Sequence, residues 1–194
     1  MLVNRKLTGG GYDAWVRVDN RVIGTGVSEV IAKHMSGKGV LVMTRGGPED
    51  NSTGKARRDG LLSKVKDTGV QVLMAPEFGK WTEDGGIRVM KDMLAMHKQI
   101  NVVFCENDSM CLGAQKAIAD AKRTGEISVF GFDGQKSAID QIAKGTNYIG
   151  SGRIGVERMA ALLAGQKVEK DTITPVVAIT RENAASLLDP NSPF

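Results

Sequence analysis

The sequence has no apolar run of about 18 residues, the length that a membrane-spanning helix requires, so we expect no transmembrane segment. The amino-terminal stretch Met1–Arg5 also lacks the long apolar core of a secretory signal peptide. Its Leu2–Val3 pair resembles the end of a β-strand instead. These features predict a chain that begins inside the fold of a longer protein.

Cysteine and histidine are scarce, with two of each. Five residues separate Cys105 from Cys111, which is not the C-x-x-C spacing of a redox or zinc site. One cysteine lies at the end of an expected strand and the other in an expected helix. We therefore interpret both as small apolar side chains that fill the core. His34 and His97 have no partner at metal-ligand spacing, so we predict no metal site.

Aromatic residues make up 5% of the chain and are not interleaved with basic residues as on a nucleic-acid-binding surface. The net charge of +4 comes from Lys and Arg spread along the chain, with one tight cluster at Lys55–Arg58. We interpret this charge as a solvated basic surface and expect no nucleic-acid partner. A hydrophobic content of 41% in 194 residues is sufficient for the core of one domain or slightly more.

Short apolar runs alternate with helical patterns along the chain. The expected strands are Leu2–Val3, Val40–Met43, Val70–Met74, Val102–Cys105, Ile127–Phe130, Asn147–Ile149 and Val176–Ile179. The expected helices are about Asn20–Ser36, Lys55–Lys66, Ile87–His97, Met110–Ala121, Gln135–Ala143, Ile154–Leu163 and Arg181–Leu188, the last capped by Thr180. The main expected loops are Lys6–Arg17, Arg45–Gly54 and Pro76–Glu83.

This order of elements favours an α/β fold. The strands lack a two-residue alternation and the connections are short, which is typical of a Rossmann-like parallel sheet with helices on both faces. Right-handed crossovers then place every strand-to-helix turn on the same edge of the sheet, where such folds bind ligands.

Enzyme motifs are incomplete. Ser52–Lys55 resembles a phosphate-binding loop, but Glu49 and Ala56 occupy the positions of the required glycine and hydroxyl residue. Gly131 lies where a phosphohydrolase needs a second carboxylate beside Asp133, and no G-x-S-x-G nucleophile elbow is present. We therefore predict no catalytic residue and no cofactor.

Polar planar groups and one aromatic residue follow successive strands, at Arg57, Trp81, Asn107, Asp133 and Ser151. Guanidinium, amide and carboxylate groups match the vicinal hydroxyls of a sugar or polyol, and an indole covers the C–H face of a ring. Each residue also has a structural interpretation, as a solvated arginine, a core residue, a helix cap or a turn residue. Their shared position on one sheet edge favours ligand recognition.

Four motifs carry a likeness to a known family. They are FCENDSM at Phe104–Met110, GFDG at Gly131–Gly134, KARRDGL at Lys55–Leu61 and TREN at Thr180–Asn183. Together they resemble the periplasmic sugar-binding proteins of the ribose-binding type, which feed ABC transporters. The resemblance covers nearly the whole chain and implies two Rossmann-like lobes, joined by hinge strands, that close around a sugar.

The resemblance also implies a set of ligand contacts. Arg57, Asn107 and Asp133 match the second-lobe contacts of the family, and Trp81 falls where the family often has an aromatic residue. Asn4 and Arg5 match an acid–arginine pair of the first lobe, with asparagine in place of the acid. Ser151 is a further candidate, in a segment that is shorter than in the family.

Compared with the family, most of the first lobe has no counterpart in the sequence. We expect residues 1–17 to be a remnant of the first lobe and hinge, 18–150 a complete second lobe, and 151–194 a return segment with a first-lobe helix, a hinge and the last strand and helix. The helix at Ile154–Leu163 would then lack packing partners, which predicts an exposed face or a homodimer of the truncated chain.

The function that the resemblance implies is that of a non-enzymatic, solute-binding component of an ABC importer, which binds a monosaccharide or polyol. Its partners would be the ABC transporter membrane subunits and its compartment the periplasm. The alternative is the effector-binding domain of a lactose-repressor-type transcription regulator, which shares the fold. An α/β enzyme, the third class, would need a catalytic group that the motifs do not supply.

Overall fold

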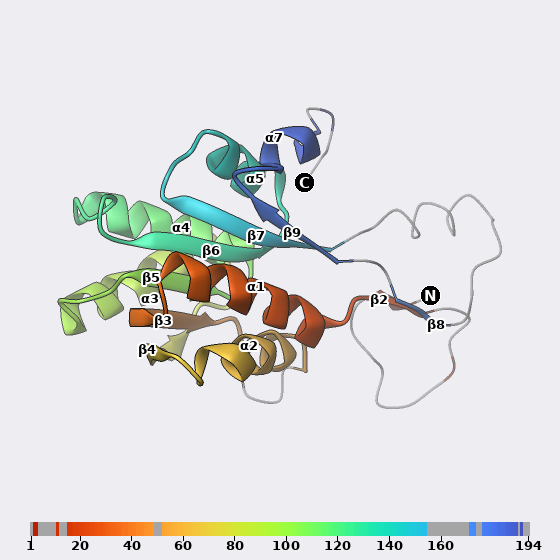
Figure 1. The fold of residues 1–194 in the computed structure, drawn as a ribbon, viewed down its shortest axis with the longest axis horizontal. Coiled ribbons are helices and arrows are strands. Elements are labelled where there is room, and N and C mark those ends of the chain that lie inside the picture. The colour runs from red at the N-terminus through yellow and green to blue at the C-terminus, as the bar shows by residue number, and fades with distance from the viewer. Residues whose placement is uncertain are drawn as a thin grey trace.

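A computed structural model describes residues 2–3, 11, 15–48, 52–154, 171–173, 176–189 and 191. Its main body is a six-stranded sheet in the order β4-β3-β5-β6-β7-β9, with helices packed on both faces (Figure 1). The strands are β3 Lys38–Arg45, β4 Gly69–Phe78, β5 Val102–Cys105, β6 Ser128–Asp133, β7 Tyr148–Ile154 and β9 Val176–Thr180. The helices are α1 Asn20–His34, α2 Ser52–Val65, α3 Glu83–Met96, α4 Asp108–Asp120, α5 Lys136–Ala143 and α7 Ala184–Leu187.

The sheet confirms the predicted α/β class. Strands β3 to β7 pair in parallel, and β9 runs antiparallel to β7 at the edge of the sheet. Strand β7 extends from Tyr148 to Ile154, so this strand continues past residue 150, the expected end of the second lobe. None of the helices among the described residues is long and apolar enough to cross a bilayer.

Two apolar cores lie on opposite faces of the sheet. Helices α1 and α2 pack on one face, and α3, α4 and α5 pack on the other. Strand β5 shows why its sequence has no polar alternation: Val102 and Phe104 belong to the first core, whereas Val103 and Cys105 belong to the second. Both faces of this central strand are buried, so the turn that follows it has a rigid support.

A separate three-stranded parallel sheet joins segments that are distant in sequence, in the order β1-β2-β8. Its strands are β1 Leu2–Val3, β2 Trp15–Arg17 and β8 Asp171–Ile173. The prediction of a loop over the whole of Lys6–Arg17 is therefore wrong at its end, where Trp15–Arg17 pairs with both neighbours. Of the expected helix Ile154–Leu163, Ile154 ends β7 and the remaining residues lie outside the described part of the chain.

Several element boundaries differ from the prediction; for example, α2 begins at Ser52, inside the expected loop Arg45–Gly54. Two of the other differences have a visible cause. Strand β4 continues to Phe78 because its end pairs with Arg45 of β3, so the loop to α3 is shorter than expected. The last helix begins at Ala184 instead of Arg181. The Asn183 side chain accepts a hydrogen bond from the Thr180 backbone N–H at 2.9 Å, which stabilises a turn over the residues expected to be helical.

Candidate functional site

Arg57 and Asp133 meet at the carboxyl edge of the main sheet. Arg57 lies near the start of α2 and Asp133 is the last residue of β6, and their side chains form an ion pair with a distance of 3.0 Å from Nη2 to Oδ1. The Arg57 side chain is 2% exposed, whereas that of Asp133 is 31% exposed. The carboxylate thus remains accessible to a solute, while the buried arginine sets its position.

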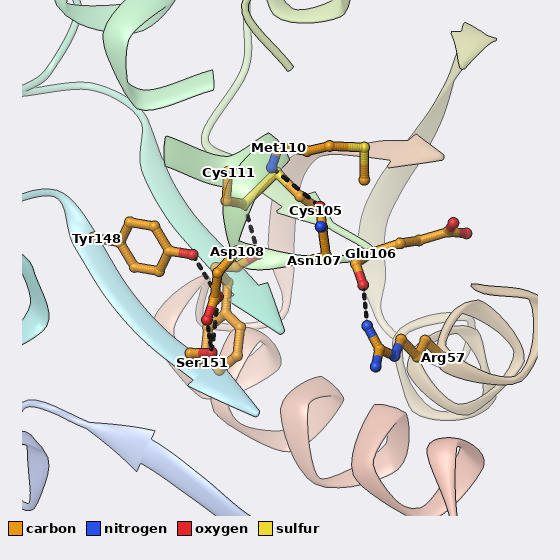
Figure 2. Close-up of a disulfide and its surroundings, with 10 residues drawn as sticks. Arg57, Cys105, Glu106, Asn107, Asp108, Met110, Cys111, Tyr148 and Ser151 are labelled. Carbon is orange, nitrogen blue, oxygen red and sulfur yellow. Dashed lines mark hydrogen bonds between the residues drawn. A yellow bond between two sulfur atoms is a disulfide. The ribbon is translucent and has the colours of Figure 1, made fainter. Parts of the chain in front are cut away.

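The other nitrogens of Arg57 bind within the protein. Its Nε donates to the side-chain oxygen of Asn20 at 3.0 Å, and its Nη1 donates to the carbonyl of Glu106 (Figure 2). The guanidinium carbon also lies 4.4 Å from the centre of the Phe132 ring. A buried guanidinium needs this number of partners to offset its lost hydration, so Arg57 is held in one orientation.

Asp133 has an unusual backbone conformation, with φ at 115°. Residues other than glycine seldom adopt positive φ, and such a conformation costs on the order of 1–3 kcal/mol. The surrounding contacts must therefore maintain it. Strain of this kind concentrates at functional sites, which supports Asp133 as a recognition residue.

Asn107 connects the turn after β5 to Trp81. Its side-chain oxygen accepts from the Met110 backbone N–H at 3.0 Å and caps α4, and its amide nitrogen donates to the Trp81 carbonyl at 3.1 Å. Trp81 itself has φ at 63°. Its indole lies against Gly46, where an added Cβ would be 2.2 Å from the indole Cε2. Asn107 thus serves as the helix cap that the sequence allowed, and it also orients the aromatic residue.

Glu106 is a buried charge that the sequence analysis did not single out. It is fully buried, pairs with Arg58 and accepts from the Gly46 backbone N–H at 2.7 Å. Burial raises the pKa of the Glu106 carboxyl, and Gly46 and Arg58 oppose that rise. Through these contacts Glu106, which follows β5, connects to α2 and to the loop after β3. The adjacent charges of Arg57 and Arg58, and Glu106 two residues before Asp108, were the signal in the sequence.

Ser151 is bound within the protein through Asp108. The serine hydroxyl lies 2.8 and 2.9 Å from the two carboxylate oxygens of Asp108, to which it donates, and it accepts from the Gly134 backbone N–H at 3.1 Å. Asp108 also accepts from the Tyr148 hydroxyl at 2.7 Å (Figure 2). Burial, followed by the nearby charge of Asp133, raises the pKa of Asp108 to about 7.

The interpretation of the cysteines as unpaired core side chains is wrong. Cys105 and Cys111 form a disulfide, with 5.4 Å between their Cα atoms (Figure 2). The strand ends at Cys105 and α4 starts at Asp108, so the first turn of the helix brings Cys111 back to the strand. A five-residue spacing closes a bridge here because the chain reverses direction. The bridged loop contains Glu106, Asn107 and Asp108.

The structure thus gathers Arg57, Asn107, Trp81 and Asp133 around the turns at one sheet edge, with Ser151 behind them. Asn4 and Arg5 lie outside the described residues. In the described ranges, no group of three or more His, Cys, Asp or Glu side chains could hold a metal ion. The arrangement offers directed hydrogen-bond groups and an aromatic ring, which is suited to the recognition of a polyhydroxylated solute.

Two curated relatives of this chain are sugar-binding proteins. The D-allose-binding periplasmic protein of Escherichia coli (strain K12) is 30% identical over 142 residues, which cover 73% of this chain and 46% of the relative. The ribose import binding protein of the same organism is 30% identical over 176 residues, which cover 86% of this chain and 58% of the relative. The chain therefore spans about half the length of these curated relatives.

The fold has a close match among solved structures. An ABC transporter solute-binding protein from Mycobacterium smegmatis, solved with bound glycerol, superposes with a TM-score of 0.83 at 23% identity, over 97% of this chain and 68% of that one. The family model described as a periplasmic binding protein domain matches residues 1–169. The chain belongs to this family of periplasmic binding protein domains, among its ribose-type sugar-binding members.

Proposed function

We propose that this chain is part of the solute-binding component of an ABC importer and binds a monosaccharide or polyol without chemical turnover. The observation that carries the proposal is the Arg57–Asp133 ion pair, which presents a partly exposed carboxylate at the same sheet edge as Asn107 and Trp81. These are groups that bind and orient a solute.

The chemistry of the site fits vicinal hydroxyls. The Asp133 carboxylate accepts hydrogen bonds, the Asn107 amide carries both donors and an acceptor, and the buried Arg57 fixes the direction of the carboxylate through the ion pair. Trp81 supplies a flat apolar surface for the C–H face of a ring. Neutral solutes gain selectivity from such directed groups because a wrong hydroxyl orientation leaves a buried polar atom unpaired.

The relatives support a transport role in the periplasm, since they are named as periplasmic or import binding proteins for sugars. The disulfide is an independent observation on this chain, because disulfides persist mainly in oxidising compartments such as the periplasm. We propose that two lobes close around the solute and that the closed form docks on the transporter membrane subunits. These relatives do not favour the regulator alternative and lend no support to a homodimer.

The proposal is tested by titrating the chain with D-ribose and D-allose. We expect saturable binding, weak for this chain alone because one lobe supplies only part of the contacts. Asp133→Asn keeps the side-chain shape but removes the charge, and we expect affinity to fall about tenfold or more. Asp120→Asn, at a side chain that is 69% exposed on α4, is the matched control and leaves affinity unchanged.

Calorimetry and NMR chemical-shift titration give the dissociation constants. Absence of binding to either sugar at millimolar concentration, or equal affinity in Asp133→Asn and wild type, would contradict the proposed function. Micromolar or tighter binding by this chain as a monomer would contradict the expectation that a second lobe supplies half of the site.

A further inference from the structure

Asp108 joins three elements behind the candidate site. It is the first residue of α4 and is fully buried. Its carboxylate accepts from the hydroxyls of Tyr148 and Ser151 on β7 and from the backbone N–H of Gln135, which lies 2.8 Å away in the turn between β6 and α5. Figure 2 shows the two hydroxyls directed at this carboxylate. We call Asp108, Tyr148 and Ser151 the Asp108 network.

The network fixes the backbone that follows Asp133. The Gly134 N–H donates to Ser151 Oγ at 3.1 Å, and the next N–H, of Gln135, donates to Asp108. The two backbone amides that follow the strained Asp133 thus both donate to the Asp108 network. Since a positive φ at a non-glycine residue persists only when its surroundings enforce it, these two bonds account for the φ of 115° at Asp133.

Gly131 makes room for the network. A Cβ at this position would lie 2.0 Å from the Tyr148 hydroxyl and 2.2 Å from Asp108 Oδ1. The absence of a side chain there lets the tyrosine reach the carboxylate between two packed strands. The glycine that argued against a phosphohydrolase site therefore has a structural role in this arrangement.

We infer that Asp108 is a positioning residue for solute binding, which acts by holding the Asp133 turn through the Asp108 network. The inference rests on the proposed function, because it assigns the cause of Asp133's orientation in that site. Asp108 does not contact the solute in this scheme. It determines whether the Asp133 carboxylate points at Arg57 and the solute or swings away with its turn.

The charges around Asp108 make this positioning sensitive to pH. Asp133 on β6 is the neighbouring negative charge, and it is paired with Arg57 of α2. Tyr148 faces Asp108 from β7, and Glu106 precedes it in the same turn, paired with Arg58. An ionised Asp108 only accepts, which matches its three donors. A protonated Asp108 must donate one bond, so a hydroxyl of the network has to turn and the Gly134 contact weakens.

The test measures D-ribose and D-allose affinity between pH 5.5 and 8.5 for wild type, Asp108→Asn, Ser151→Ala and the control Asp120→Asn. We expect Asp108→Asn to bind about tenfold more weakly at pH 8, and Ser151→Ala about threefold more weakly. We expect wild-type affinity to fall as the pH drops below about 7. In Asp108→Asn that fall shifts to lower pH, because Asp133 no longer has a carboxylate neighbour.

If both variants keep the affinity and the pH profile of wild type, the inference is overturned and the proposed function remains intact. An equal loss at every pH would also overturn it, since a purely structural role predicts that result. If Asp108→Asn fails to fold, Ser151→Ala decides alone: weaker binding with a shifted Gly134 amide resonance supports the inference, and unchanged binding overturns it. Failure of the wild type to bind either sugar overturns both proposals.

Discussion

Trp81 takes its place in the candidate site because residue 46 is a glycine. The indole lies against the Gly46 backbone, and the same backbone N–H is bound by Glu106. The Asn107 side chain then holds the Trp81 carbonyl. One residue without a side chain therefore allows three site elements to approach one another, and its substitution reports on the site as a whole.

We predict that Gly46→Ala destabilises the protein and displaces Trp81. The new methyl group would overlap the indole, and overpacking of this kind costs about 1–3 kcal/mol of unfolding free energy. Urea unfolding and the tryptophan emission maximum give the two readouts. Gly26→Ala in α1 is the control: nothing lies within 4 Å of its added Cβ, so we expect a gain of about 0.5–1 kcal/mol. Equal stability changes in the two variants would contradict this role of Gly46.

At the scale of elements, the turn from β5 to α4 carries the site, and the Cys105–Cys111 disulfide closes it. The bridge restrains Glu106, Asn107 and Asp108. Glu106 pairs with Arg58, and Asn107 donates to the Trp81 carbonyl. Asp108 accepts from the turn that follows Asp133. A cross-link at this position limits the conformations of the turn in the unfolded chain and keeps its three side chains in register when folded.

We predict that the double variant Cys105→Ala, Cys111→Ala loses about 2 kcal/mol of unfolding free energy, as expected for a short closed loop. Both positions are fully buried, and alanine is suitable there because its side chain has no polar group. Denaturant unfolding with and without reductant measures the loss. Wild type with its bridge reduced should approach the double variant, which itself should not respond to reductant. If the double variant were as stable as wild type in oxidising buffer, the bridge would have no structural role.

The sequence predicted the elements better than the contacts between their side chains. Apolar runs and helical spacing located the central strands and most helices because burial on both faces leaves a strong pattern. The boundaries at Phe78 and Ala184 depended on pairing with Arg45 and on the Asn183 side chain, which a local pattern does not encode. The disulfide likewise depends on the chain reversal after Cys105.

The same limit applies to the site. Arg57, Asn107 and Asp133 are predicted as ligand contacts because recognition chemistry and family motifs both mark them, and they stay a prediction. Asp108 and Tyr148 were missed, since their importance comes from a hydrogen bond between residues 40 positions apart. A lone buried aspartate has no sequence signature until its donors are known.

At the scale of the whole molecule, three carboxyl groups lie at one sheet edge: those of Glu106 and Asp108 are buried, and that of Asp133 is partly exposed. Burial is the largest cause that raises the pKa of Glu106, Asp108 and Asp133, and for Asp108 the value reaches about 7. In the unfolded chain these groups return to ordinary values near 4. Between those values the folded protein binds more protons than the unfolded chain. The contribution of Asp108 to the unfolding free energy therefore decreases as the pH rises from about 4 to about 7, and is level above it. The raised pKa values of Glu106 and Asp133 act in the same direction.

We predict that Asp108→Asn removes the largest part of this dependence. A single group with a raised pKa contributes a slope of at most about 1.4 kcal/mol per pH unit across its window. The unfolding free energy of wild type minus that of Asp108→Asn should thus decrease from pH 5 to pH 7 and stay constant from pH 7 to pH 8.5. Urea unfolding at half-unit pH steps measures it, with Asp120→Asn as the variant whose curve should run parallel to wild type. A constant wild-type-minus-Asp108→Asn difference across the range would show that Asp108 stays ionised in the folded protein, and the turn it holds would then be insensitive to pH.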